Sequence, residues 1–200
     1  MDSAESASAG DDLPFTGSEM LRYFSELDSI LVSTGASTMV HLYVGGGAVI
    51  AVKTDARLTT DVDVVSEGMT EQLRQCVAEV SRRHRGLRPD WLNDGAKLHR
   101  VSLPMAPERL YTGERLLIDS AGDQYVLVMK LASGRQIDEA DCEILIRTIG
   151  IRTESELFDL IEQGVPADLR TPAMVYFAAE RLAAAYTGTS RRHHPRGASS

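Results

Sequence analysis

Asp61 and Asp63 stand one residue apart in the stretch TTDVDVV, with Val62 between them. Successive side chains of a β-strand point to opposite faces, so in a strand both carboxylates share one side while Val62 and Val64 turn towards the core. Two neighbouring carboxylates repel each other, and a divalent cation removes that repulsion while acting as a Lewis acid. Because both ligands are oxygen donors, the pair predicts a site for Mg²⁺ or Mn²⁺.

Three consecutive glycines, Gly45 to Gly47, precede the aspartates. Without β-carbons, Gly45 and Gly46 allow the backbone to approach a phosphate closely, and the amides at the start of a following helix can hydrogen-bond it. Arg57 and Thr59, just before the acids, complete a predicted nucleotide-binding group. The alternative is a tight turn at the glycines and a solvated strand edge at the aspartates. The combination of the two motifs favours a nucleotide with a metal.

These motifs need a strand, a helix and a second strand to position them. The β-branched and aromatic residues of 38–44 predict a strand that runs into the glycines, residues 48–52 predict a short helix, and residues 59–65 alternate as a strand. Before them, apolar residues at helical spacing predict a helix that Ser18 caps and Gly35 follows. The other predicted elements are a helix over 69–85, strands over 98–103 and 116–119, and helices over 125–133 and 138–148. Two further helices are predicted, one that Thr153 caps and one that begins at Pro172.

A lysine and two aspartates form a second candidate cluster. If the helix that carries Lys130 continued without a break, Asp141 would follow 11 residues later on nearly the same face. In one interpretation Lys130 neutralises a triphosphate, and Asp141 or Asp138 is a third carboxylate or the base for an attacking hydroxyl. In the other, Asp138 caps a helix, Asp141 lies in its first turn and Lys130 is solvated. Asp119 and Asp94 are further candidates for a third carboxylate.

The glycines with the D-x-D pair resemble the first motif of the polymerase-β-type nucleotidyltransferases, and particularly of the AbiEii and MenT-like toxin branch. The stretch KLASGRQIDEADCEIL is similar to that branch's second motif, a lysine followed by a helix with an R…D-x-x-D-x-x-L pattern. The matching positions are Lys130, Arg135, Asp138 and Asp141, and Leu145 stands one residue later than the pattern expects. The resemblance spans residues 42–145. It implies an α/β (α+β) nucleotidyltransferase fold with a mixed β-sheet flanked by helices and a helical C-terminal extension.

The resemblance also implies an activity: metal-dependent transfer of an NMP from an NTP to an acceptor hydroxyl, with release of pyrophosphate. The implied acceptor is the 3′ end of a tRNA, and the implied partner is a protein antitoxin that neutralises a toxin. Related toxins imply that Thr59 is a target for inactivation by the partner, and the alternative is an ordinary strand residue. The implied functional residues are Asp61 and Asp63 for the metal, Gly45, Gly46, Arg57, Thr59 and Lys130 for the nucleotide, and Asp138 and Asp141 for catalysis with Asp61, Asp63 and Lys130.

Two other functions stay open. One is transfer of a nucleotide to a small hydroxyl compound such as an aminoglycoside, which the formal net charge of −8 suits better than it suits tRNA. The other is a degenerate fold that binds a nucleotide or a partner without catalysis, and the presence of Asp61, Asp63 and Lys130 argues against it. A basic cluster over 82–88 could bind an RNA backbone or could simply complement a helix C-terminus.

Composition sets the remaining expectations. The chain of 200 residues has 43% hydrophobic and 25% charged residues, which is typical of a globular protein. Its longest apolar run, 39–52, is too short to predict a membrane span, and Cys76 and Cys142 lie in apolar helical patterns typical of free thiols in a reducing cytoplasm. The predicted organisation is a disordered leader over 1–16, a nucleotidyltransferase domain over 17–150, a helical extension over 151–187 and a disordered basic tail over 188–200.

Overall fold

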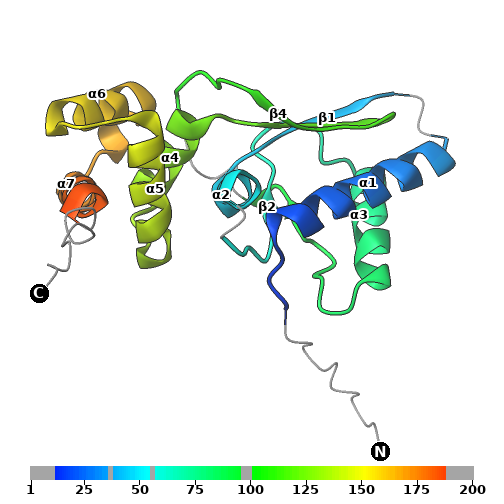
Figure 1. The fold of residues 1–200 in the computed structure, drawn as a ribbon. Helices are drawn as coiled ribbons and strands as arrows, with labels where there is room; N and C mark the ends of the chain where they lie inside the picture. Colours follow the sequence, from blue (N-terminus) through cyan, green and yellow to red (C-terminus); the bar gives the residue numbers. More distant parts are fainter. Residues whose placement is uncertain (1–11, 36–37, 55–56, 96–100, 188–200) are drawn as a thin grey trace, which may run out of the picture. The chain divides into compact units, whose positions relative to one another are not determined.

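The computed structural model of the protein describes residues 12–35, 38–54, 57–95 and 101–187. Within these residues it is a mixed α/β protein with a small β-sheet region flanked by helices, which confirms the predicted class at this level (Figure 1). The chain forms two compact units. The first contains residues 1–96 and 109–119, and the second contains residues 97–108 and 120–200. No helix among the described residues is both long enough and apolar enough to cross a membrane.

The first unit holds the β-structure together with the helices that cover it. Figure 1 shows α1 and α3 on one side of the strands β1 and β4. The aromatic residues Phe24 and Trp91 are fully buried in this unit, with ring centroids 5.9 Å apart. Its described elements are α1 (Gly17–Ser33), β1 (Val40–Val44), α2 (Gly46–Thr54), β2 (Val62–Asp63), α3 (Glu71–Arg83), β3 (Leu92–Asn93), β4 (Glu108–Thr112) and β5 (Leu116–Ser120), with Glu108 and Ser120 counted in the second unit.

Two small sheets meet at β1. One has the strand order β1-β5-β4, and the other pairs β2 with β3 in parallel, with Val62 opposite Leu92. An isolated antiparallel bridge joins Val44 of β1 to Val64, and both side chains are fully buried. The bridge places the residues before the glycine turn directly beside the residues of the D-x-D pair.

The start of α1 differs from the prediction. Thr16, not Ser18, is the N-cap, and it forms a capping box with Glu19. Phe15 is 2% exposed and forms a bridge with Thr59. The leader predicted over 1–16 therefore ends before Phe15, because this ring is part of the core; residues 1–11 lie outside the described residues.

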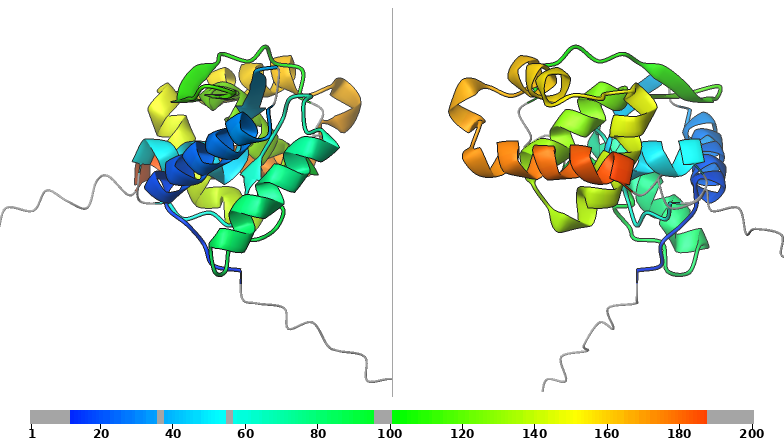
Figure 2. Two further views of the ribbon diagram at one scale, coloured as in Figure 1. Left: turned by 90° about the vertical axis from the view of Figure 1, so that its right-hand side faces the viewer. Right: turned by 60° about the vertical axis from the view of Figure 1, so that its left-hand side comes forward.

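The second unit is built from helices in its described part, apart from residues 101–107, which lie in no helix or strand, the connecting loops, and the residues that end β5 and begin β4. Helix α4 packs against α5, α6 and α7, and α7 also packs against α5 and α6 (Figure 2). The predicted capping box of Thr153 with Glu156 and the predicted helix start at Pro172 are both confirmed. Its helices are α4 (Asp123–Ser133), α5 (Glu139–Ile149), α6 (Glu154–Gly164) and α7 (Pro172–Thr187), with short 3₁₀ turns at Gln136–Asp138 and Ala167–Leu169.

Several predicted boundaries change. The strand predicted over 59–65 is reduced to Val62–Asp63, and the strand predicted over 98–103 is wrong for residues 101–103, which lie in no strand; residues 98–100 lie outside the described part. The division of the chain also differs from the predicted boundary after residue 150, because α4 and α5 pack with α6 and α7. The predicted basic tail over 188–200 lies outside the described residues.

Candidate functional site

The glycine turn between β1 and α2 lies against the side chain of Asp63. Gly46 has a φ of +67°, a conformation that favours glycine. A β-carbon at this position would stand 2.4 Å from Asp63 Oδ2. The amide of Gly45 also donates a 2.8 Å hydrogen bond to the Asp63 carbonyl oxygen. The absence of a side chain at Gly46 therefore leaves the space that the Asp63 carboxylate occupies.

Arg57 and Thr59 reach the next residue of the same turn. A β-carbon at Gly47 would lie 3.4 Å from Thr59 Oγ1 and 3.6 Å from Arg57 Nη2. Thr59 is buried, and its hydroxyl donates to the Asp61 carbonyl oxygen at 2.9 Å. Backbone amides at a helix start and a guanidinium group are both donors suited to phosphate oxygens. The structure thus gathers most of the first predicted group at the start of α2: Gly45, Gly46, Arg57, Thr59 and Asp63.

The two aspartates alternate with buried valines, as predicted for a strand. Val62 and Val64 are fully buried, whereas Asp61 and Asp63 are half-buried. Among the described residues, no three His, Cys, Asp or Glu side chains form a group that could hold a metal ion. Mg²⁺ bound with a nucleotide commonly uses one or two carboxylates, phosphate oxygens and water. Asp63 beside the glycine turn fits that arrangement, whereas Asp61 lies near enough to Arg88 to help raise the pKa of its guanidinium. A site built from protein side chains alone is not found in the described part of the chain.

Gly46 offers a direct test of this geometry. Gly46→Ala should lower the free energy of unfolding by about 1 kcal/mol for its left-handed backbone and by a further 1–3 kcal/mol for the clash with Asp63. Gly35→Ala is the matched control, because Gly35 has a φ of +71° and no described atom lies within 4 Å of its added β-carbon. Urea denaturation of both variants should give the larger loss for Gly46→Ala, and equal losses would show that Asp63 does not fill this space.

The second predicted cluster is buried in the second unit. Lys130 Nζ lies 2.5 Å from Asp138 Oδ1 and 2.8 Å from Asp141 Oδ2. Lys130 is 6% exposed and Asp141 is 0% exposed. Burial alone would lower the pKa of Lys130, but its hydrogen bonds to the two carboxylates outweigh burial and raise that pKa. The ammonium group therefore stays charged and is neutralised by its own neighbours.

The cluster forms for a different reason than the sequence suggested. Gly134 ends α4 in a left-handed conformation with a φ of 60°, so α4 does not continue towards Asp141. Lys130 and Asp141 meet because α5 packs back against α4. As the alternative predicted, Asp138 is the N-cap residue of α5 and Asp141 lies in its first turn, but the Asp138 side chain makes no capping hydrogen bond and accepts from Lys130 and Ser133 instead. The prediction that Lys130 is solvated is wrong, because Lys130 is buried.

Cys142 follows Asp141 in α5 and gives a chemical test of this packing. Burial raises the pKa of the Cys142 thiol to about 12, so the reactive thiolate is scarce near pH 8. Cys76 is also buried, and burial raises the pKa of its thiol. Neither thiol of the folded protein should react with iodoacetamide at pH 8, whereas both should react in urea. Mass spectrometry that finds Cys142 alkylated in the folded protein would contradict its burial.

A third cluster was not predicted. His41 Nε2 lies 2.7 Å from Asp119 Oδ2, and Arg109 also donates to the Asp119 carboxylate. Burial alone would raise the pKa of Asp119, but the hydrogen bonds from Arg109 and His41 hold it below its usual value. His41 and Asp119 are 78 residues apart in sequence, and no local pattern indicates their contact; only the pairing of β1 with β5 does.

The remaining candidates are engaged in ion pairs of the first unit. Asp94 pairs with Arg74 at 2.8 Å, and Asp119 pairs with His41 and Arg109. Among the described residues, neither joins the D-x-D pair as a third carboxylate. In the basic cluster, Arg82 and Arg83 both pair with Glu79 on α3. His84 and Arg88 also have acidic partners, Glu26 at 2.8 Å and Asp90 at 2.9 Å. These partners reduce the positive charge that the cluster could offer to RNA.

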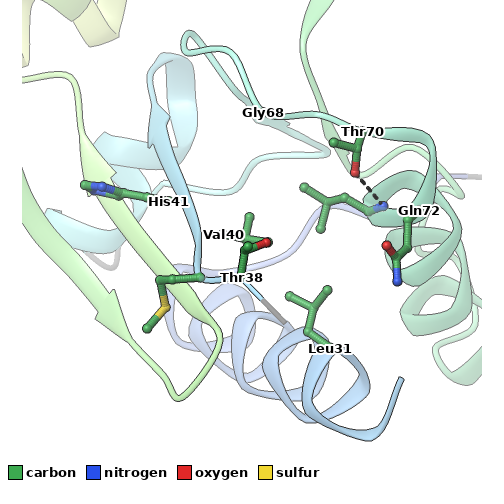
Figure 3. Close-up of a pocket in the computed structure, with 9 residues that line it drawn as sticks. Leu31, Thr38, Val40, His41, Gly68, Thr70 and Gln72 are labelled. Carbon is green, nitrogen blue, oxygen red and sulfur yellow. Dashed lines mark hydrogen bonds between the residues drawn. The ribbon is translucent and has the colours of Figure 1, made fainter. Parts of the chain in front are cut away.

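The first unit also contains a cavity of about 430 Å³, which lies apart from the glycine turn. Leu31, Val40 and Thr70 are among its lining residues, and no glycine of the turn or aspartate of the D-x-D pair lines it (Figure 3). The cavity lies at the start of β1, whereas the glycine turn follows the end of that strand.

The first predicted group thus lies within one compact unit, and Lys130, Asp138 and Asp141 lie within the other. Comparisons of the chain with protein-family models, curated proteins and solved structures find no match. The function must therefore be argued from the chemistry of these residues.

Proposed function

We propose that the protein is a metal-dependent nucleotidyltransferase that transfers an NMP from an NTP to an acceptor hydroxyl. The observation that carries the proposal is the contact of one glycine turn with a carboxylate, a hydroxyl and a guanidinium, from Asp63, Thr59 and Arg57. Such a turn at the start of a helix suits a phosphate chain, and the two aspartates suit the metal that accompanies it. The nucleotidyltransferase fold is part of this proposal.

The predicted nucleotide-binding and metal-binding residues of the first unit each have a role in the proposal. The amides at the start of α2 and the Arg57 guanidinium bind phosphate oxygens, and Gly46, without a side chain, leaves room for the Asp63 carboxylate beside them. Asp61 and Asp63 hold Mg²⁺ or Mn²⁺, which when bound supplies a Lewis acid that polarises the phosphoryl group. Thr59, packed against Gly47, keeps the Asp61 backbone in place through its 2.9 Å hydrogen bond. This hydroxyl is buried and already donates its hydrogen bond to Asp61, which argues against its modification by a partner. That modification stays a prediction.

The reaction forms one bond and breaks one. The acceptor oxygen forms a bond to the α-phosphorus, the bond from that phosphorus to the bridging oxygen of the β-phosphate breaks, and pyrophosphate leaves with the bonding electrons. The acceptor proton passes to a base. Asp141 or Asp138 as this base, and Lys130 as a cation for the triphosphate, stay predictions.

The proposed acceptor is the 3′ end of a tRNA, and the proposed biological role is that of a toxin neutralised by a protein antitoxin. This part of the proposal rests on the sequence resemblance to the AbiEii and MenT-like branch. A toxin of this kind would arrest growth when its expression is induced without its partner.

The experiment that tests the proposal uses the purified full chain, total tRNA and each of the four NTPs labelled at the α-phosphate. We expect label on the tRNA with Mg²⁺ and none with a chelator, together with release of pyrophosphate. Nucleotide binding without any transfer would favour the non-catalytic binding module. Neither binding nor transfer with any NTP would refute the proposal.

One observation favours a second acceptor. The net charge of −8 and the isoelectric point near 5.1 disfavour contact with a polyanion. A small hydroxyl compound such as an aminoglycoside, which is cationic, avoids that repulsion. The same labelled NTPs with an aminoglycoside in place of tRNA separate the two acceptors, because label appears on only one of them.

A further inference from the structure

Strand β1 presents two aromatic rings on the face opposite its buried residues. Leu42 and Val44 are fully buried, whereas the His41 side chain is 37% exposed and Tyr43 is half-buried. The ring centroids of His41 and Tyr43 lie 4.7 Å apart, with their planes at 35°. In Figure 3 the His41 ring points away from Leu31 and Val40, on the other side of the strand. The rings therefore form a pair on the outer face of the sheet.

Asp63 of the D-x-D pair faces the same side. The antiparallel bridge between Val44 and Val64 is flanked by hydrogen bonds from the Val65 amide to the Tyr43 carbonyl oxygen and from the Gly45 amide to the Asp63 carbonyl oxygen. Directly opposed residues of antiparallel strands share a face, so Tyr43 and Asp63 lie on the face opposite the two valines. At about 3.3 Å per residue, Tyr43 lies roughly 7 Å and His41 roughly 13 Å along β1 from the level of Asp63.

Neighbouring strands hold the His41 ring in position. Asp119 of β5 is 5% exposed and binds His41 Nε2, and Arg109 of β4 fixes the same carboxylate. The Arg109 side chain is 45% exposed, and its Nη1 also donates to Thr112 at 3.3 Å. The charges of Arg109 and Asp119 cancel, and Asp63 on the same face adds a negative charge, so the face is polar and aromatic and is not basic.

We propose that His41 and Tyr43 form a stacking subsite for an unpaired nucleobase of a single-stranded RNA acceptor. The inference rests on the proposed function, which places the reacting phosphate beside Asp63 on the same face. Exposed aromatic rings on a sheet face bind unpaired bases by stacking, and every base has a face to stack. Because this face is not basic, stacking contributes more to binding than phosphate contacts do, and binding should depend only weakly on salt.

The test measures binding alone, so it needs neither NTP nor metal. Fluorescence anisotropy with the full chain and a labelled, unstructured RNA of about 10 nucleotides gives the affinity. Tyr43→Ala and His41→Ala should each weaken binding by roughly fivefold to 100-fold, whereas Tyr43→Phe and His41→Phe should stay close to the wild-type protein, because both keep a ring. A duplex of the same length should bind much more weakly, since its bases are paired.

The phenylalanine variants distinguish stacking from a structural role. His41→Phe loses the hydrogen bond to Asp119, so a purely structural His41 would make it as weak as His41→Ala. Tyr176→Ala is the matched control, because Tyr176 lies on α7 and is 66% exposed; it should bind RNA like the wild-type protein. Circular dichroism checks that each variant is folded.

Three outcomes overturn the subsite: no binding of single strands, equal binding of duplex and single strands, or unchanged binding by folded Tyr43→Ala. None of them bears on nucleotide transfer to a small molecule, which the labelled-NTP experiment measures separately. Conversely, RNA binding that depends on these rings in a protein that transfers no nucleotide would refute the proposed function and leave the subsite intact.

Discussion

Lys130→Met should lower the free energy of unfolding by about 3–5 kcal/mol, because it leaves two carboxylates without their cation in a buried site. Asp141 is fully buried and lies 2.8 Å from Lys130 Nζ. A carboxylate in such a site cannot recover its hydration without unfolding or taking up a proton. Urea denaturation followed by circular dichroism measures the loss.

Two further variants sharpen this test. Lys130→Met with Asp141→Leu should be more stable than Lys130→Met alone, because the second change removes the uncompensated charge. Arg74→Met is the matched control: the Arg74–Asp94 pair is also a contact of 2.8 Å, but Arg74 is 43% exposed, and its loss should cost about 1 kcal/mol or less. A Lys130→Met protein as stable as Arg74→Met would contradict the buried cluster. The result also matters for nucleotide binding, since a loss of affinity in a Lys130 variant is informative only if the variant is folded.

Asp61→Asn combined with Asp63→Asn should weaken Mg²⁺-dependent NTP binding by at least about 100-fold, because amides keep the size of the side chains and remove both charges that hold the metal. Calorimetry with a non-hydrolysable NTP, with Mg²⁺ and with a chelator, gives the four affinities. We expect the wild-type protein to bind tightly only with Mg²⁺, and the double variant to bind weakly in both conditions.

Asp159→Asn is the control for this experiment. Asp159 is an exposed aspartate of α6 in the second unit, so its replacement changes the net charge without touching the glycine turn or the D-x-D pair. It should leave NTP binding unchanged. Equal affinities of the wild-type protein with chelator and with Mg²⁺ would exclude the metal from nucleotide binding.

The sequence predicts best the features that local residues determine. The capping box of Thr153 and the helix start at Pro172 are correct because the signals lie within the first turn of each helix. The burial of Val62 and Val64 is correct because alternation is a local property of a strand. The N-cap at Ser18 is wrong because Thr16 has the better box partner in Glu19.

Features that depend on distant partners were missed. The segment of β4, ERLYT, has no clear alternation of burial and is a strand only because it pairs with β5. The contact of His41 with Asp119 needs the same pairing. The cluster of Lys130 with Asp141 was predicted for the wrong reason, since periodicity suggested one helix and the chain instead reverses after Gly134. The site predicted beside Asp63 was accessible from sequence because its residues lie within a short stretch.

The chain passes from one compact unit to the other three times, after residues 96, 108 and 119. Neither unit is therefore a continuous segment, and this has a consequence for synthesis on the ribosome. Strand β1 emerges long before β5, its neighbour in the three-stranded sheet. Until residue 120 has left the exit tunnel, the edge of β1 that β5 will cover is an unpaired row of amides and carbonyls, open to association with other nascent chains. Folding of the first unit must wait for part of the chain that follows it, so chaperones that shield strand edges have their longest opportunity to act here.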